Sequence, residues 1–306
     1  MLEINVEGRL GNQMFQYATL RAMQEKKYSD KINMCFKNIE RRKNVKDGWE
    51  NALKYFDVKE FETLDEIHPS IIQKIVLKIY IKFWNKHRNS RIEEHNYEKR
   101  YIKILNFFGI YWLTQGYYDF KNSLAKNKLF FGYFESDKYF NNIREELLEE
   151  FTPKKEKLKK NEELYKAIEN SNSVCVTIRR GDFIQINQVR DAALVCTEDY
   201  FYKAIEEMKK LVPEVKFFVF SDDIDWCKEN MKFPKGTMYE DGTDPIWEKL
   251  RLMYSCKNFI ISNSTFSWWA QYLSQNEKKI VIAPNKWRNY ENKIEIYQDN
   301  WKVIDV

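Results

Sequence analysis

Val174–Phe183 has the sequence VCVTIRRGDF, and this stretch decides the predicted fold of the second half of the chain. Residues 174–178 are mostly apolar and β-branched, which is typical of a buried strand. Arg179 and Arg180 follow at once, although a hydrophobic strand gains no packing from charges at its end. Guanidinium groups present planar forks of donors that match phosphate oxygens. The stretch therefore predicts a strand whose carboxyl end binds an anion, and the competing interpretation is a structural pair of arginine and Asp182.

After Lys160, short apolar segments alternate with amphipathic ones. Strands are expected at 174–178, 215–220, 259–261 and 280–283, and helices are expected to follow Thr197, Asp244-Pro245 (N-cap and first residue) and Thr265. This alternation predicts a doubly wound parallel sheet, whose ligands bind beyond the carboxyl ends of the strands. The arginine pair, Ser221-Asp222-Asp223 and the SNSTFS segment all lie at such ends, and together they predict one site.

The first half begins with the same kind of unit. Residues 2–6 are expected to form a strand, and a glycine-containing loop, GRLGN, leads to a helix over 14–26. This arrangement offers backbone N–H groups to a ligand, although an ordinary strand-to-helix turn explains it as well. The lysine-rich stretch 154–160 is interpreted as a solvated linker or helix end, which divides the chain into domains 1–160 and 161–306.

Composition limits the class of protein. Of the 306 residues, 43% are hydrophobic, and 51 basic residues nearly balance 46 acidic ones. A net charge of +5 is too small to indicate nucleic-acid binding, and none is expected. Five scattered cysteines without a CxxC pair predict reduced thiols in a cytoplasmic protein rather than disulfides or a zinc site. Neither a signal peptide nor an apolar run of about 20 residues is seen.

The segment 71–86 has a separate pattern. Its apolar residues share one side of a predicted helix, and its lysines line the other side: Ile71, Ile72, Ile75, Val76, Ile79, Tyr80 and Phe83 against Lys74, Lys78, Lys82 and Lys86. Packing of the apolar side on the domain is the favoured interpretation. The alternative is peripheral contact with an anionic membrane surface.

Two further motifs bear on the chemistry of the predicted site. Ser262–Trp269, SNSTFSWW, offers hydroxyls and helix N-terminal amides that can cradle a phosphate, and a plain helix N-cap is the simpler explanation. Asp223-Ile224-Asp225 is a DxD sequence, which holds a divalent cation in some sugar transferases. Because the two arginines already supply neutralising charge, no metal and no cofactor are expected, and Asp223 is expected to begin a helix.

Taken together, the motifs resemble the α-1,2-fucosyltransferases of glycosyltransferase family 11. The resemblance extends over most of the chain and is carried by GRLGNQMFQYA, GYFESDKYF, TIRRGDF, DYFYKAIEEM, FFVFSDDIDWCKEN, LRLMYSCKNFIISNSTFSWWA and IAPNKW. It implies a GT-B-like α/β fold, in which two Rossmann-type doubly wound domains face a central cleft. It also implies inverting, metal-independent transfer of L-fucose from GDP-β-L-fucose to the 2-hydroxyl of a terminal galactose on a glycan.

The resemblance assigns roles to individual residues. Arg179 is expected to hold the β-phosphate and stabilise the departing GDP, with Arg180 and Asp182 in support. Substrate contacts are expected from Ser264, Thr265, Ser267 and Asp222 in the second domain and from Gly8, Gly11 and Asn12 in the first. Glu135 and Asp182 are the candidates for the general base.

This chain departs from the family pattern at two positions that resemblance places against the guanine base. Thr177 stands where relatives have histidine, and Glu248-Lys249-Leu250 replaces Glu-Asp-Leu. Thr177 and Glu248 are expected to contact the substrate. Either Glu248 or another carboxylate reads guanine, or the donor carries another nucleotide. A non-catalytic nucleotide- or glycan-binding protein is the third hypothesis. The sequence indicates no particular oligomeric state.

Overall fold

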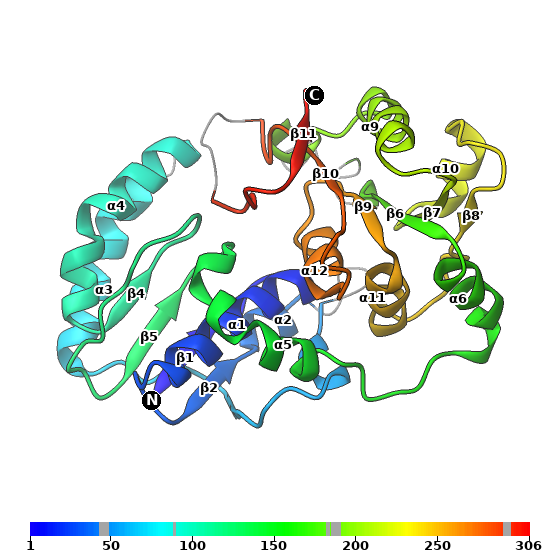
Figure 1. The fold of residues 1–306 in the computed structure, drawn as a ribbon. Coiled ribbons are helices and arrows are strands. Elements are labelled where there is room, and N and C mark those ends of the chain that lie inside the picture. Colours follow the sequence, from blue (N-terminus) through cyan, green and yellow to red (C-terminus); the bar gives the residue numbers. More distant parts are fainter. Residues whose placement is uncertain (43–48, 88–89, 182–183, 185–190, 290–294) are drawn as a thin grey trace. The chain divides into compact units, whose positions relative to one another are not determined.

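Two separate parallel sheets organise the chain (Figure 1). The computed structural model describes residues 1–42, 49–87, 90–181, 184, 191–289 and 295–306. Unit 1 comprises Met1–Thr152 with Glu295 and Ile296, and unit 2 comprises the described residues from Pro153 onward without those two. The boundary therefore falls eight residues before the predicted one. Each unit is described by itself.

Unit 1 contains a five-stranded sheet with the strand order β3-β2-β1-β5-β4, and every strand pair in its described part is parallel. Because β1 and β5 are neighbours, the loops that follow them meet at one edge of the sheet. Figure 1 shows α3 and α4 side by side along the β4 side of this sheet. The elements are β1 (Leu2–Asn5), α1 (Leu10–Glu25), β2 (Ile32–Cys35), α2 (Lys37–Glu40), β3 (Glu62–Leu64), α3 (Ile71–Trp84), α4 (Arg91–Phe107), β4 (Ile110–Trp112), β5 (Lys128–Phe131) and α5 (Arg144–Glu150).

Unit 2 contains a six-stranded sheet with the order β11-β10-β9-β6-β7-β8, again with parallel pairs throughout the described strands. Numbered from its first strand, this is the 3-2-1-4-5-6 order of the dinucleotide-binding fold. The predicted α/β class with two parallel sheets is thus confirmed. The elements are α6 (Glu162–Glu169), β6 (Asn172–Ile178), α9 (Glu198–Leu211), β7 (Val215–Ser221), α10 (Ile224–Asn230), β8 (Met238–Tyr239), α11 (Ile246–Ser255), β9 (Asn258–Ile260), α12 (Thr265–Leu273), β10 (Val281–Pro284) and β11 (Lys302–Ile304).

The core of unit 2 explains why β6 is a nearly continuous apolar run. Six of its seven residues are buried, because helices cover both faces of a parallel sheet. Val174 and Val176 on one face pack with Ile205 and Met208 of α9. The helix α6 contacts β6 and packs with α11, which in turn packs with α12. This double cover fixes the strand ends that carry the candidate site.

The lysine-rich stretch 154–160 is part of unit 2: its lysines are exposed, as expected of a solvated stretch or helix end, and it leads through a turn at Lys159–Asn161 into α6, but it is also bonded to the rest of the unit. The Leu158 backbone N–H donates to Glu248 Oε1 at 3.0 Å. Lys160 Nζ lies 2.9 Å from Asp244 Oδ1. These contacts tie the stretch to α11 and its preceding loop. They also explain why α11 begins at Ile246, after Pro245, without the predicted Asp244 cap: the Asp244 carboxylate is bonded elsewhere.

The helix α3 matches its predicted range, but the predicted orientation is wrong. Its buried residues are Gln73, Leu77 and Tyr80. Leu77 and Tyr80 join a cluster with Trp112 of β4 and Leu105 of α4. Of the seven residues expected to pack on the domain, Tyr80 is buried and Val76 is partly buried, but the other five are exposed: Ile71, Ile72, Ile75, Ile79 and Phe83.

Candidate active site

The strand order of unit 2 creates a topological switch point between β6 and β9. From β6 the chain proceeds to β7 on one side, and from β9 it proceeds to β10 on the other. Ligands of open α/β sheets bind in the crevice that such a divergence leaves beyond the carboxyl ends of the strands. Arg179 directly follows β6, and Ser262–Ser264 closely follow β9. The sheet therefore brings the two predicted phosphate-binding segments to the same place.

Arg179 is held by a carboxylate of the neighbouring strand end. Its Nη1 lies 2.6 Å from Asp222 Oδ2, and the side chains are 22% and 26% exposed. The other carboxylate oxygen, Asp222 Oδ1, accepts from the Arg180 backbone N–H at 2.8 Å. Asp222 thus fixes both the guanidinium and the backbone of this turn. Partial exposure leaves the arginine accessible to an anion.

Arg180 is directed differently. Its Nε donates to Asp223 Oδ2 at 3.1 Å, and its guanidinium carbon lies 3.1 Å from the centre of the Trp226 ring. Stacking on an aromatic face and a carboxylate partner together fix the side chain against α10. Asp223 also precedes the first residue of α10, as predicted. The two arginines therefore have separate carboxylate partners.

Gly181 is required by the close approach of Asp222. A Cβ atom at position 181 would lie 2.4 Å from Asp222 Oδ2, far inside van der Waals contact. A side chain there would push the carboxylate away from Arg179. Asp182, the predicted partner of the arginines and candidate base, lies outside the described residues.

Thr177 and Ser267, two predicted substrate-binding residues, are buried and bonded within the protein. The Thr177 hydroxyl accepts from the Ser262 backbone N–H at 3.1 Å, which joins β6 to the end of β9. Ser267 Oγ lies 3.2 Å from Ser262 Oγ. Ser264 and Thr265, in contrast, are half-buried at the N-terminus of α12. Of these four predictions, Ser264 and Thr265 have the exposure that ligand binding needs.

Asn263 was not predicted as a site residue, but it holds the loop that presents Ser264. Its Nδ2 donates to Ala193 O at 2.7 Å and to Trp287 O at 2.9 Å. A buried amide between two loops fixes the start of α12. In the sequence, only the SNS motif could have indicated this role of Asn263, because an asparagine between two serines is typical of a structured loop.

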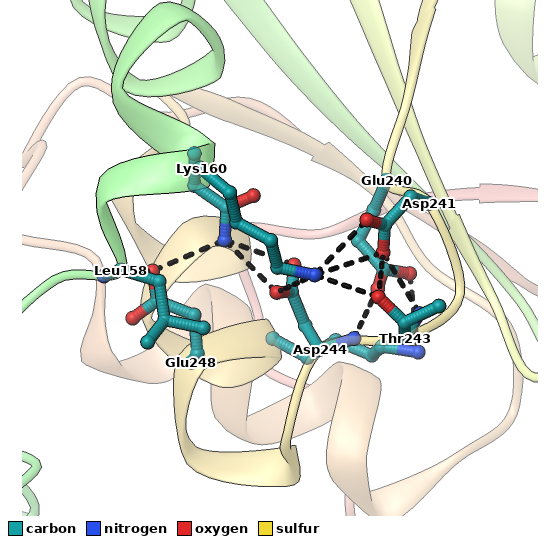
Figure 2. A network of polar contacts seen from close by, with 9 residues as sticks. Leu158, Lys160, Glu240, Asp241, Thr243, Asp244 and Glu248 are labelled. Atoms are coloured by element: carbon teal, nitrogen blue, oxygen red, sulfur yellow. Dashed lines mark hydrogen bonds and ion pairs between the residues drawn. The ribbon is translucent and has the colours of Figure 1, made fainter.

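Glu248 and Lys249 occupy different environments, and Figure 2 shows that of Glu248. Glu248 is fully buried, and its carboxylate accepts from Leu158 N, from Asn161 Nδ2 at 3.2 Å and from Arg251 Nη1 at 3.2 Å. These contacts hold the Glu248 carboxylate inside unit 2. Recognition of the guanine base by Glu248 therefore stays a prediction, and the geometry of the side chain does not support it.

Lys249 points to the carboxyl end of β7. Its Nζ lies 3.1 Å from Glu240 Oε2 and 3.4 Å from the Ser221 carbonyl oxygen. Glu240 is buried, so the pair neutralises two charges close to the Asp222 turn. Nearby, Asp241 and Asp244 both pair with Lys160 (Figure 2). The hydrogen bonds from Thr243, with help from Lys160, lower the pKa of Asp241 to about 2.

In unit 1, the predicted ligand-binding loop, GRLGN, follows β1. Gly8 has a φ of +82°, and a Cβ there would lie 2.3 Å from Asn12 Nδ2. Two glutamines of α1, which were not predicted, hold this loop: Gln13 Nε2 donates to Gly8 O and Gln16 Nε2 to Glu7 O. Gly11 is buried inside α1, and Asn12 is half-buried. The candidate base Glu135 follows β5, the strand next to β1, and is buried.

Comparison with known proteins places the chain in a family. An Escherichia coli alpha-1,2-colitosyltransferase is 30% identical over 97% of each chain, and the E. coli O-antigen biosynthesis glycosyltransferase WbnK is 27% identical over 97% of this chain and 98% of its own. Galactoside alpha-(1,2)-fucosyltransferase 1 of Leontopithecus chrysomelas is 27% identical over 53% of this chain and 47% of its own.

A crystal structure of NodZ alpha-1,6-fucosyltransferase soaked with GDP-fucose aligns with a TM-score of 0.47 and 13% identity, over 89% of this chain and 92% of that one. The profile of glycosyl transferase family 11 matches residues 1–305. The chain belongs to glycosyl transferase family 11 and is a glycosyltransferase.

Proposed function

We propose that this glycosyltransferase transfers L-fucose from GDP-β-L-fucose to the 2-hydroxyl of a terminal galactose on a cell-surface glycan or oligosaccharide. The observation that carries the proposal is the partly exposed Arg179, which Asp222 fixes at the switch point of unit 2. Membership of family 11 supports the reaction class. The names of the α-1,2-specific relatives support the linkage.

The chemistry is a displacement at the anomeric carbon. The acceptor oxygen forms a bond to C1 of the sugar from the face opposite the diphosphate, so a β-linked donor gives an α-linked product. The C1–O bond to the β-phosphate breaks, and its electron pair stays on the departing GDP. The hydroxyl proton passes to a carboxylate base, for which Asp182 and Glu135 are the candidates.

Negative charge accumulates on the leaving diphosphate, and Arg179 with its neighbours can stabilise that charge. A guanidinium already held by a carboxylate requires little reorganisation when the negative charge develops. Ser264 and Thr265 at the N-terminus of α12 add hydroxyl and backbone donors on the β9 side. Because the protein supplies this positive charge, the proposed reaction needs no metal, and EDTA is expected to leave the rate unchanged. Reduced cysteines agree with a cytoplasmic reaction.

The test compares Arg179→Ala with Arg144→Ala, an arginine of α5 in unit 1. Binding of GDP, UDP, ADP and dTDP is measured by calorimetry without metal, and transfer is measured with GDP-fucose and a galactoside. Removal of Arg179 is expected to lower kcat by roughly a hundredfold or more, with an unchanged circular dichroism spectrum. Full transfer by Arg179→Ala, or tight binding of a nucleotide other than GDP, would contradict the proposal.

A second donor is favoured by the 30% identity to a colitosyltransferase. Colitose is L-fucose without its 3-hydroxyl group, so both sugars present the same anomeric chemistry. A site that hydrogen bonds to the 3-hydroxyl rejects the deoxy sugar strongly, whereas a site with an apolar wall there accepts both. The ratio of kcat/KM for GDP-fucose and GDP-colitose, measured on one acceptor, decides between the two donors.

A further inference from the structure

The helix α3 leaves a row of large apolar side chains on the surface of unit 1. Five of them are between 44% and 79% exposed: Ile71, Ile72, Ile75, Ile79 and Phe83. At 3.6 residues per turn these positions share one side of the helix. A contiguous apolar surface of this kind marks an interaction site, whereas isolated exposed apolar residues need no explanation.

The exposed row is a consequence of firm packing on the opposite side of α3. Leu77 and Tyr80 are buried in the cluster with Trp112. Gln73 Nε2 donates to the backbone carbonyls of Phe108 and Asn127, both at 2.9 Å. A rotation of the helix that hid the isoleucines would break these bonds and expose Tyr80. The apolar row is therefore a fixed part of the folded surface.

Positive charge accompanies this row. Lys74, Lys78 and Lys82 are exposed, and no ion pair to them is found in the described part of the chain. The segment Ile71–Trp84 contains no acidic residue. Lysines that have no acidic partner on their own helix favour a partner with negative charge.

The combination indicates the kind of partner. An anionic bilayer offers negative head groups to the lysines and an acyl boundary to the isoleucines at the same time. With 14 residues, α3 is about 21 Å long, shorter than the hydrocarbon core. No described helix is both long and apolar enough to cross a membrane. A helix with these features lies in the plane of the interface.

We propose that α3 binds anionic lipid bilayers, with the isoleucine row at the acyl boundary and Lys74, Lys78 and Lys82 against the head groups. The observation is independent of Arg179 and the other residues at the switch point, which are in unit 2, and it uses none of the candidate site residues of unit 1. Membrane attachment does not depend on the identity of the donor sugar.

The test is co-sedimentation of the full chain with vesicles of phosphatidylcholine alone or mixed with phosphatidylglycerol. Binding is expected only with phosphatidylglycerol and is expected to weaken at high salt. Ile72→Gln/Ile75→Gln/Ile79→Gln and Lys74→Gln/Lys78→Gln/Lys82→Gln are each expected to lower the partition coefficient by roughly tenfold or more.

The matched control for charge replaces three exposed lysines of unit 2, Lys232→Gln/Lys235→Gln/Lys278→Gln, and is expected to bind vesicles like the parent chain. Equal unfolding midpoints show that the variants fold. The proposal is overturned if the parent chain does not bind anionic vesicles, or if the isoleucine variant binds these vesicles as well as the parent chain does. It is also overturned if sedimentation velocity shows a dimer that the isoleucine variant dissociates, because the row would then bind a second copy.

Discussion

Arg21 in unit 1 pairs with the buried Glu150 and with the more exposed Glu25, and Arg179 in unit 2 pairs with Asp222; the Arg21–Glu150 and Arg179–Asp222 pairs differ in burial. Arg21 and Glu150 are 3.0 Å apart, with side chains 1% and 7% exposed. Tyr17 OH also donates to Glu150 at 2.6 Å, and burial followed by that bond raises the pKa of Tyr17 well above its usual range. Arg179 and Asp222 are 2.6 Å apart and about a quarter exposed. The buried pair holds α1 to α5, whereas the exposed pair is open to a ligand.

The largest expected effect follows from breaking the buried pair. Arg21→Met leaves the buried Glu150 carboxylate with only the exposed Lys59, whose Nζ is 3.9 Å away, and is expected to lower the free energy of unfolding by about 3–5 kcal/mol. Arg179→Met removes a partly exposed pair and is expected to change it by less than about 1 kcal/mol. Urea denaturation followed by circular dichroism measures both.

Arg21→Met/Glu150→Leu is the control, because it removes both charges and is expected to recover most of the lost stability. Equal destabilisation by Arg21→Met and Arg179→Met would show that burial does not separate the two pairs.

An intermediate effect is expected from Glu98, a buried carboxyl of unit 1 that pairs with no cation among the described residues. Burial raises its pKa from near 4.5 to about 7, although hydrogen bonds from Thr114 and Trp112 partly oppose the shift. Because the folded pKa is the higher one, the stabilising contribution is complete below pH 4.5 and is lost as the pH rises through 7.

Over that window the parent chain is expected to lose about 3 kcal/mol of stability relative to Glu98→Gln, since each unit of pKa shift corresponds to about 1.4 kcal/mol. Unfolding curves at pH 5, 6, 7 and 8 measure the difference between the two slopes. If the stability of the two proteins depended on pH with the same slope, the raised pKa of Glu98 would be refuted. The contrast between buried and exposed carboxylates would then fail as well.

The smallest effects separate the two carboxylates of the exposed site. Asp222→Asn weakens the hold on Arg179 and is expected to lower kcat by about tenfold with little change in KM. Asp223→Asn leaves Arg180 on the Trp226 ring and is expected to lower kcat only a few fold. Stability should change by less than about 1 kcal/mol in both. A larger loss of kcat in Asp223→Asn would assign the leading role to Arg180.

Much of the site follows from local sequence. The apolar run before Arg179 predicts a strand, and polar clusters after successive parallel strands predict one ligand-binding edge. Local sequence did not reveal every partner, however. Asp182, the expected partner of the arginines, lies outside the described residues, and Asp222 and Asp223 contact the two arginines because β6 and β7 are neighbours in the sheet. The Ser221-Asp222-Asp223 cluster carried the signal, and sheet order was needed to use it.

Glu248 and the lysine stretch 154–160 illustrate a second limit of prediction from local sequence. A carboxylate in a family motif was expected to read a base, and the lysine stretch 154–160 was expected to be a solvated linker or helix end. The lysines are exposed, but the Leu158 backbone N–H donates to Glu248 and Lys160 pairs with Asp244, so the stretch is tied to α11 and the loop before it (Figure 2). Local sequence does not reveal such contacts, because the partners are about 90 residues apart along the chain.

Two helices of 14 residues show what each level of structure decides. In α9 the periodic apolar residues, among them Phe201 and Ile205, are buried, as the pattern predicts. In α3 an equally clear pattern faces outward, and Leu77 and Tyr80 make the contact with the sheet. Periodicity depends only on neighbouring residues, so the sequence by itself determined that both helices form, and it determined the strand that ends at Arg179. Which face is buried depends on the surface that the rest of the chain presents, and only the tertiary structure decided that.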